Sequence, residues 1–224
     1  MSVNISGNGA IEGITSFNGG GLTFRNILYN GWVNTSSEIN QRGKTIAQVS
    51  NGNYFADRWE RVSSTTMTQK VEEKNYIPNR TYTISGTNVT TVQVTSPASG
   101  TWDWGTVPSD ASLVQLELGD TASSFEYRPY GLELSLCQRY YQFAYANIRG
   151  RGGGISENAV TWNTQMRIAP TILRIAAASG GGLNNIIRYL DIAPYGCRME
   201  ATNTQPGGTE SYALAQILEL NAEL

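Results

Sequence analysis

The sequence predicts a mainly β protein, built from two small antiparallel β-sandwich domains that are joined by a short helix. Three observations lead to this fold class. Only 15% of the 224 residues are charged, and polar uncharged residues and 24 glycines stand in their place. Apolar residues alternate with a period of two in several short stretches, which turn-forming residues separate. One stretch near the middle changes to helical spacing, and the alternation then returns.

Residues 1–24 are small, polar and rich in glycine, and they end near Gly19-Gly20-Gly21. Such a segment buries little apolar surface by itself, so we expect an extended N-terminal arm. Two interpretations stay open. The arm pairs with another chain through Ile5, Ile11 and Ile14, or it is a loose terminus.

Residues 25–130 are expected to form the first β domain. Alternating apolar residues predict strands at Arg80–Ser85, Thr90–Thr95 and Ser112–Gly119. Turn-forming residues such as Asn51-Gly52-Asn53 lie between the stretches. Short strands at this spacing are typical of a small antiparallel sandwich.

Residues 131–143 are the predicted linking helix. Leu132, Leu136 and Tyr140 are spaced by four, which places them on one helical face. A helix of this length is marginally stable alone in water, so the apolar face needs a partner. That partner is either the protein's own sheet or copies of the same helix around a symmetry axis.

Residues 144–224 are expected to form the second β domain. Ala159–Ala169 has the clearest alternation, with Trp162, Met166 and Ile168 on one face. Four further strands are predicted, at Thr171–Ala177, Asn185–Ile192, Gly196–Thr202 and Glu210–Leu220.

Three glycine clusters separate the predicted strands of this domain, and we expect them to form loops at the strand ends. They are Gly152–Gly154, Gly180–Gly182 and Gly207-Gly208. The first continues Arg149-Gly150-Arg151, which looks like an RNA-binding tract but occurs once and between predicted strands. We therefore interpret it as a loop.

The composition excludes several classes of function. The chain has no histidine. It therefore cannot use the serine–histidine or cysteine–histidine arrangements of catalysis, and it cannot bind a metal through imidazole. Cys137 and Cys197 are too few for a structural zinc site, and the sequence does not decide whether they form a disulfide. The net charge of −2 argues against nucleic-acid binding. No apolar stretch suits a membrane helix, and no secretory signal is seen, so synthesis in a cytoplasm is expected.

Carboxylates are the remaining candidates for catalysis or metal binding. Glycoside hydrolysis needs two of them across a sugar bond, but no spacing singles out a pair, so we expect no enzymatic activity and no cofactor. Glu117 and Asp120 could help to hold a calcium ion, although no complete ligand loop is visible. The candidate carboxylates are Asp103, Asp110, Glu117, Asp120 and Glu126.

Aromatic side chains are the better candidates for binding. Trp102 and Trp104 would share one face of a strand, where they either stack on sugar rings or fill the core of the first domain. In the second domain, Tyr195 lies between Pro194 and Gly196 in a predicted turn and is the best exposed candidate. The other candidates there are Tyr189 and Tyr212, with Arg151 and Asn184 as hydrogen-bonding partners.

Several segments form distinctive motifs. Asn30-Gly31 is followed by Ile39-Asn40-Gln41-Arg42-Gly43, and then by Ala56-Asp57-Arg58-Trp59. Further along are Gln115–Ala122 with Phe125–Arg128, Leu136–Tyr141, Met166–Thr171 and Ala222–Leu224. Together these segments resemble the receptor-binding tail fibre proteins of tailed bacteriophages and prophages. The stretch between Trp59 and Gln115 is short for the sugar-binding jelly roll usually found there, so the resemblance implies that residues 25–130 form a reduced jelly-roll-like β domain.

The resemblance implies a homotrimeric virion protein of the tail that recognises a polysaccharide on the host cell surface without cleaving it. The arm at residues 1–24 would attach to other tail or baseplate proteins, and the helix around Leu132, Leu136 and Tyr140 would lie near the threefold axis. Two alternatives stay open. One is a structural tail or baseplate component that contacts only virion proteins, and the other is a depolymerase that degrades a glycan.

Overall fold

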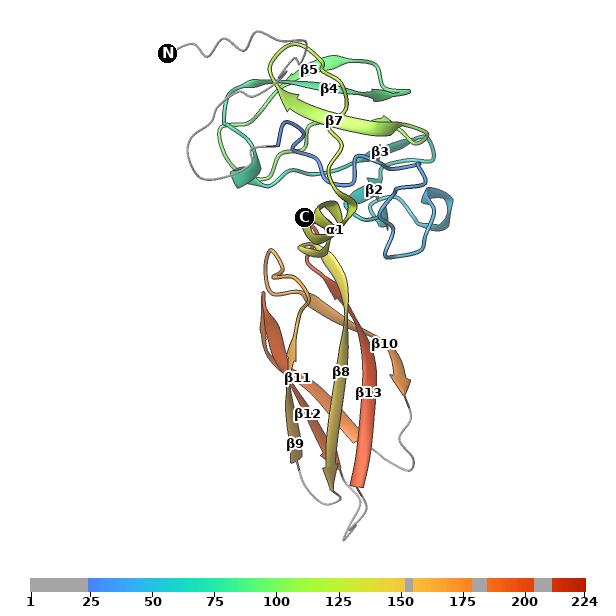
Figure 1. Ribbon diagram of the computed structural model, residues 1–224, viewed down its shortest axis with the longest axis vertical. Coiled ribbons are helices and arrows are strands. Elements are labelled where there is room, and N and C mark those ends of the chain that lie inside the picture. Colours follow the sequence, from blue (N-terminus) through green and yellow to red (C-terminus); the bar gives the residue numbers. More distant parts are fainter. Residues whose placement is uncertain (1–23, 152–154, 179–184, 204–210) are drawn as a thin grey trace. The chain divides into compact units, whose positions relative to one another are not determined.

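The computed structural model describes residues 24–151, 155–178, 185–203 and 211–224. Its sheets are antiparallel, and α1 (Tyr130–Gln138) is the only α-helix of the described residues, so the predicted mainly β class is confirmed (Figure 1). The chain divides into two compact units. The first contains residues up to Glu38, Thr45–Phe55 and Trp59–Arg128. The second contains Ile39–Lys44, Ala56–Arg58 and Pro129–Leu224, and therefore includes the helix.

The first unit has two small sheets. The predicted strands at Arg80–Ser85, Thr90–Thr95 and Ser112–Gly119 are confirmed as the three strands of one of them. That sheet has the order β5-β4-β7, with β4 (Thr81–Thr87), β5 (Val92–Thr95) and β7 (Ser112–Leu118). The other has the order β1-β2-β3-β6, with β1 (Tyr54–Ala56), β2 (Trp59–Arg61), β3 (Thr66–Thr68) and β6 (Val107–Pro108).

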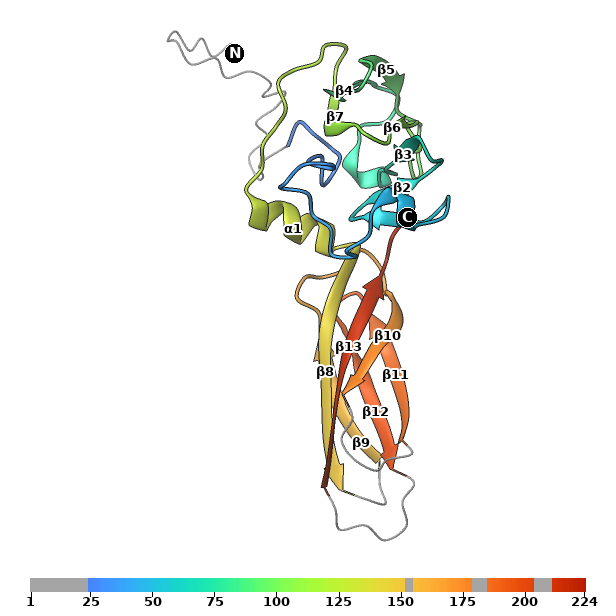
Figure 2. The same ribbon diagram turned by 90° about the vertical axis from the view of Figure 1, so that its right-hand side faces the viewer.

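The second unit is a sandwich of two three-stranded sheets (Figure 2). One sheet has the order β10-β13-β8 and the other the order β11-β12-β9. The strands are β8 (Tyr141–Arg151), β9 (Ile155–Thr161), β10 (Thr171–Ala178), β11 (Asn185–Ala193), β12 (Gly196–Asn203) and β13 (Ser211–Asn221). The predictions for β10, β11, β12 and β13 are confirmed to within one residue at each end.

Alternation along the strands builds the core of this sandwich. Side chains that are two residues apart point to the same face of a sheet, so a strand with one buried face contributes every second residue. The buried strand residues are Ala144, Ala146 and Ile148 on β8, Val160 on β9, Cys197, Met199 and Ala201 on β12, and Leu218 and Leu220 on β13.

The strand predicted at Ala159–Ala169 is wrong over most of its length, because β9 ends at Thr161. Trp162 and Met166 are buried, as their alternation suggested, but they lie in a loop. The amides of both residues donate hydrogen bonds to the carbonyls of the Pro194-Tyr195 turn, at 3.2 Å for Trp162 and 2.7 Å for Met166. Ile168, the third residue of the predicted face, is exposed.

The helix predicted at residues 131–143 ends earlier, at Gln138, and the chain enters β8 at Tyr141. Tyr140 therefore lies outside the helix, and its side chain is buried. The buried residues of α1 are Glu133 and Cys137, whereas Leu132 and Leu136 are half-buried. The four-residue spacing predicted that a helix forms, but it predicted the wrong face as the buried one.

Candidate functional site

The strand ends that border the three glycine clusters meet at one end of the second unit (Figure 1). In one sheet, Arg151 at the end of β8 pairs with Ser211 at the start of β13. Ala178 at the end of β10 pairs with Ala215 on the same strand β13. In the other, Ile155 pairs with Thr202 and Asn185 with Asn203. Only three residues separate β8 from β9, so both sheet ends belong to the same end of the sandwich. We call it the glycine end.

Two of the predicted binding residues lie on strands at the glycine end. Arg151 is the last residue of β8, and Tyr212 is the second residue of β13. Asn184 and the glycine clusters Gly152–Gly154, Gly180–Gly182 and Gly207-Gly208 lie outside the described residues.

Tyr195 lies at the opposite end of the sandwich, so it does not share a surface with Arg151. β11 starts at the glycine end and runs nine residues to Ala193, which is about 30 Å of extended chain, before the turn at Pro194-Tyr195. Tyr195 is exposed, with 70% of its surface accessible. Tyr189, in the middle of β11, packs against the core and is half-buried. The predicted binding residues of this domain therefore do not all lie at one end of the sandwich.

The two tryptophans of the first unit are core residues. Trp102 and Trp104 are each only 4% exposed. The rings of Tyr76 and Tyr82 contact Trp102 edge-on, with centroids at 5.4 and 5.1 Å. The indole nitrogen of Trp104 donates to the carbonyl of Gln69. Of the two interpretations, the structure therefore supports core filling, and neither indole presents a face for a sugar ring.

Two of the five candidate carboxylates stabilise the local fold. Glu117 is buried and accepts hydrogen bonds from the Gln115 side chain at 2.8 Å and from the amide and hydroxyl of Ser123 at 2.7 and 2.6 Å. Glu126 accepts from the backbone amides of Arg25 and Asn26, at 3.2 and 3.0 Å. Hydrogen bonds within residues 115–128 thus connect the last segment of the first unit to β7, and Glu126 connects it to residues 25 and 26.

The other three carboxylates, Asp103, Asp110 and Asp120, are exposed. No group of three or more cysteine, aspartate or glutamate side chains gathers in a metal-binding arrangement within the described ranges.

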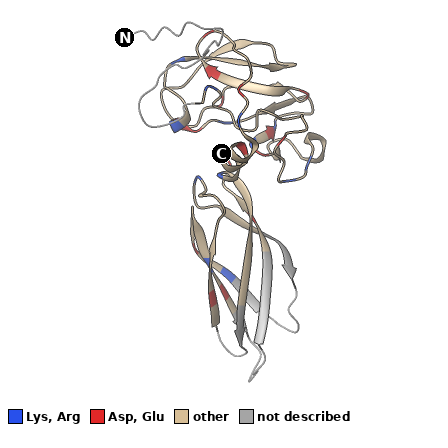
Figure 3. Cartoon of the chain, viewed as in Figure 1, with Lys and Arg blue, Asp and Glu red and all other residues tan. Residues whose placement is uncertain are grey.

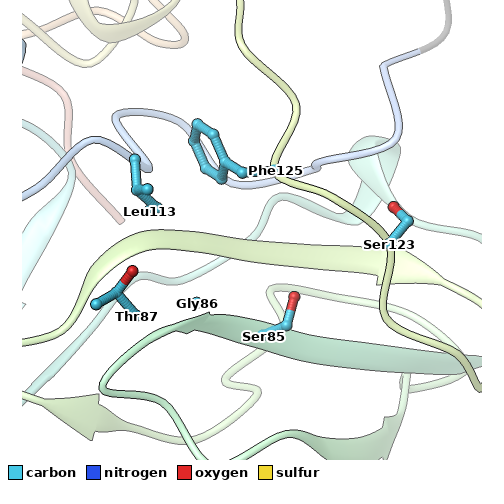
Figure 4. A pocket seen from close by; sticks show the side chains of 6 residues that line it. All are labelled: Ser85, Gly86, Thr87, Leu113, Ser123 and Phe125. Carbon is cyan, nitrogen blue, oxygen red and sulfur yellow. The ribbon is translucent and has the colours of Figure 1, made fainter.

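A hollow of about 220 Å³ lies in the first unit beside a bulge in β4 (Figure 4). None of the side chains that line it carries a formal charge, and the Ser123 hydroxyl already donates to Glu117. The lining residues are Ser85, Gly86, Thr87, Leu113, Ser123 and Phe125.

The sheet β11-β12-β9 carries charged residues of both signs (Figure 3). Arg198 contacts Glu157 at 2.5 Å and Asp191 at 3.0 Å, and Arg188 contacts Glu200 at 3.7 Å. The two pairs of Arg198 are exposed, and exposed pairs of this kind contribute little to stability.

A buried ionic cluster in the second unit was not predicted. Glu223, just after β13, contacts the guanidinium groups of both Arg42, at 3.3 Å, and Arg58. The Arg58 amide also donates to Glu223, at 3.4 Å. Asp57 lies 3.6 Å from Arg42. We call these four residues the arginine clasp, and none of their side chains is more than 6% exposed.

Two neighbouring tyrosines cover the arginines of the clasp. The guanidinium carbon of Arg58 lies 3.6 Å from the centre of the Tyr140 ring, and that of Arg42 lies 3.6 Å from the centre of the Tyr141 ring. A guanidinium over an aromatic face is attracted by the ring electrons, and it is more weakly hydrated than an ammonium group. This explains how two arginines are buried side by side.

The Asp57 side chain is fully buried. Its carboxylate accepts from the amide of Gln41 at 3.1 Å and from the Gln41 side chain at 2.5 Å. Burial raises the pKa of Asp57 from 3.8 to about 7. The hydrogen bonds from Gln41 and the charge of Arg42 oppose that rise, and the charge of Glu223 adds to it.

The clasp had a signal in the sequence. Its members come from three of the motifs, Ile39–Gly43, Ala56–Trp59 and Ala222–Leu224, and each motif contributes a charged residue. Nothing in one sequence indicates that segments so far apart meet.

The sequence left open whether the two cysteines form a disulfide. In the structure both are buried free thiols, so they are not bonded to each other. Cys137 lies on α1, and Cys197 lies on β12 in the core of the sandwich. Burial raises the pKa of both thiols, to about 11 for Cys197.

Within the described part of the chain, no helix has the length and apolar character needed to cross a membrane. Comparison of the chain with protein-family models, with curated proteins and with solved structures finds no match.

Proposed function

We propose that this chain is a non-catalytic receptor-binding protein of a phage tail fibre, and that it attaches to a glycan on the host surface through the glycine end. The observation that supports this is the convergence of the strand ends that border three glycine-rich connections. Loops at one end of a rigid sandwich can vary without disturbing the core, and weak sugar binding becomes useful when several copies engage together.

Host-cell adsorption of matched variants tests the proposal. Arg151→Ala and Tyr212→Ala alter the glycine end, whereas Tyr195→Ala alters the opposite end of the same unit. We expect the first two variants to lower adsorption and Tyr195→Ala to leave it unchanged, with all three proteins equally folded. Loss of adsorption in Tyr195→Ala alone would move the site to the opposite end. Unchanged adsorption in all three variants would mean that neither end of the sandwich recognises the host.

Two further assays separate the alternatives. Binding of the wild-type chain to a glycan array is expected, and its absence would favour a structural tail component that contacts only virion proteins. Release of new reducing ends from host polysaccharide would instead identify a depolymerase.

We further propose that the chain is a homotrimer. Tyr140 is buried within its own chain, so it is not available for a contact between subunits. The subunits would instead meet through the outer face of the sheet β10-β13-β8, where Tyr145 is 65% exposed and pairs with the exposed Ile217. Leu173 on β10 is also exposed. Light scattering should give three times 24.4 kDa. Tyr145→Ser should weaken assembly, whereas Tyr195→Ser, an equally exposed tyrosine elsewhere, should not.

The remaining parts of the proposal concern the N-terminal part of the chain. Residues 1–24, which lie almost wholly outside the described residues, would attach the protein to other tail or baseplate proteins. The first unit would be a reduced jelly-roll-like domain. Deletion of the arm should abolish incorporation into particles and leave a folded oligomer, and normal incorporation would reject this role.

A further inference from the structure

The hollow in the first unit lies between β4, β7 and the chain segment that follows β7. Ser85 and Thr87 line it from β4, and Leu113 lines it from β7. Ser123 and Phe125 line it from the following segment (Figure 4). Its volume of about 220 Å³ is below the roughly 300–1,000 Å³ of pockets that enclose a whole drug-sized ligand. It therefore suits one ring-sized group.

The Phe125 ring forms a fixed wall of this hollow. Tyr127 packs edge-on against it, with the two ring centroids 5.0 Å apart. The Phe125 ring also lies against Gly31, where an added Cβ atom would stand 2.9 Å from it. Two of the sequence motifs, Asn30-Gly31 and Phe125–Arg128, therefore meet at this wall and hold the ring in place.

Hydrogen bonds hold the segment that carries Ser123 and Phe125 against β7. The amide and the hydroxyl of Ser123 donate to Glu117 at 2.7 and 2.6 Å. The Glu126 amide donates to the side chain of Gln115 at 2.9 Å. The hollow is thus formed without a ligand, and a ligand would not bear the entropic cost of ordering this segment.

Two hydroxyl groups in the hollow are available to a ligand. Within the described part of the chain, the hydroxyls of Ser85 and Thr87 form no hydrogen bond with the protein, whereas that of Ser123 is engaged by Glu117. A hydroxyl group both donates and accepts, so it can pair with another hydroxyl. None of the lining side chains is charged, so a charged ligand would find no opposite charge among them.

Leu113 has an unfavourable backbone conformation at the same place. Its φ angle is +51°, in the left-handed region, and together with Val114 it lies opposite Gly86 in the bulge. Glycine is the residue that such a bulge position favours. The leucine side chain instead lines the hollow. Strained residues of this kind cluster at ligand sites, and a ligand that contacts this side chain would explain why leucine stands here.

We propose that this hollow binds one neutral sugar residue. The C–H groups of the sugar would lie against Phe125 and Leu113, and its hydroxyls would pair with Ser85 and Thr87. An aromatic ring attracts C–H groups through its electron-rich face, and uncharged hydroxyls suit a ligand that is itself rich in hydroxyls. The site belongs to the first unit and goes beyond the recognition proposed for the glycine end.

Amide NMR of the full chain, titrated with single sugars, tests the site. The neutral probes are glucose, galactose, mannose, rhamnose, N-acetylglucosamine and N-acetylgalactosamine, and glucuronate is the charged counterpart. We expect at least one neutral sugar to shift the amides of Ser85, Gly86 and Leu113 in a saturable way, and glucuronate to bind more weakly than that sugar. No saturable shift of these amides with any neutral sugar overturns the proposal, and so does tighter binding of glucuronate.

Variants that remove one hydroxyl at a time test the proposed contacts. Ser85→Ala and Thr87→Val should each weaken sugar binding about threefold to tenfold, the effect of losing one neutral hydrogen bond. Thr81→Val is the matched control, because Thr81 is exposed on the same strand and does not line the hollow. Equal loss of binding in Thr81→Val and Thr87→Val would overturn the assignment of the site.

Leu113→Asn separates a binding role from a structural one. Asparagine tolerates the left-handed backbone better than leucine, so the strain is relieved while the apolar side chain of the hollow is lost. We expect weaker sugar binding by a folded protein, and unchanged binding would overturn the contact. If a variant does not fold, the wild-type titration decides. Arg151→Ala, at the glycine end, should leave the shifts unchanged, so failure of this site and failure of the glycine end are distinguishable.

Discussion

Gly31 and Val114 are joined so closely that only glycine fits at position 31. The Val114 amide donates to the Gly31 carbonyl at 2.8 Å, and a Cβ atom on Gly31 would stand 2.5 Å from the Val114 carbonyl oxygen. The preceding Asn30 has a φ angle of +55°, and its carbonyl accepts from the Trp59 indole at 2.9 Å. The Asn30-Gly31 motif is thus explained by backbone packing against β7.

Gly31→Ala is expected to destabilise the first unit by about 1–3 kcal/mol, because the added methyl group overlaps the Val114 backbone. Gly131→Ala is the matched control. That position lies on α1 with open space around it, and alanine is the better helix former, so stability should be unchanged or higher. Chemical denaturation of both variants measures the difference. Equal stability of Gly31→Ala and wild type would contradict the packing argument.

Glu117→Gln is expected to lower the free energy of unfolding by about 1–3 kcal/mol, because an amide group cannot accept all three hydrogen bonds that reach this buried carboxylate. Asp120→Asn, three residues further on and exposed, should have almost no effect. If Glu117→Gln instead left stability unchanged and altered calcium binding in calorimetry, a ligand role would replace the structural one.

Trp102→Ala should cost about 3–5 kcal/mol, because it leaves a large cavity between Tyr76 and Tyr82. Tyr195→Ala should change stability by less than about 0.5 kcal/mol, since that ring is exposed. Urea unfolding monitored by fluorescence compares the two variants. A stable Trp102→Ala protein with reduced sugar binding would restore the stacking role for this indole.

The two thiols should react slowly with a thiol reagent in the native protein at pH 8. With a pKa of about 11, only about 0.1% of Cys197 is thiolate at that pH, and Cys137 is buried with a pKa raised well above its usual value. Denaturation should release two reactive thiols per chain, which Ellman's reagent counts. Fewer than two thiols after denaturation without reductant would indicate a disulfide.

Alternation in the sequence was sufficient to predict β4, β5 and β7, and β10 to β13 were predicted as the stretches that follow in a domain punctuated by glycine clusters. Alternation with a period of two indicates a strand with one buried face, and it can be recognised within a short stretch of sequence. The same pattern failed at residues 162–169, where Trp162 and Met166 are buried in a loop that covers one end of the sandwich. Periodicity reports burial, and it does not distinguish a strand from a loop whose side chains happen to point inwards.

The candidate site was predicted less well than the fold. The three glycine clusters indicated loops, but which end of the sandwich each loop occupies depends on strand order. The hairpin of β11 and β12 therefore separates Tyr195 from Arg151. Trp102 and Trp104 could not be assigned from spacing, since a tryptophan pair on a strand looks the same whether its face is covered or open.

The sequence by itself determined the mainly β class, most strands, the α-helix near residue 130 and the absence of imidazole chemistry, because each depends on local pattern or composition. Only the tertiary structure decided what the motifs do. Ile39–Gly43, Ala56–Trp59 and Ala222–Leu224 lie far apart in the chain, and their charged residues acquire a shared role when folding brings them into one buried clasp. The burial that gives Asp57 its raised pKa is a property of that assembly and of no segment alone.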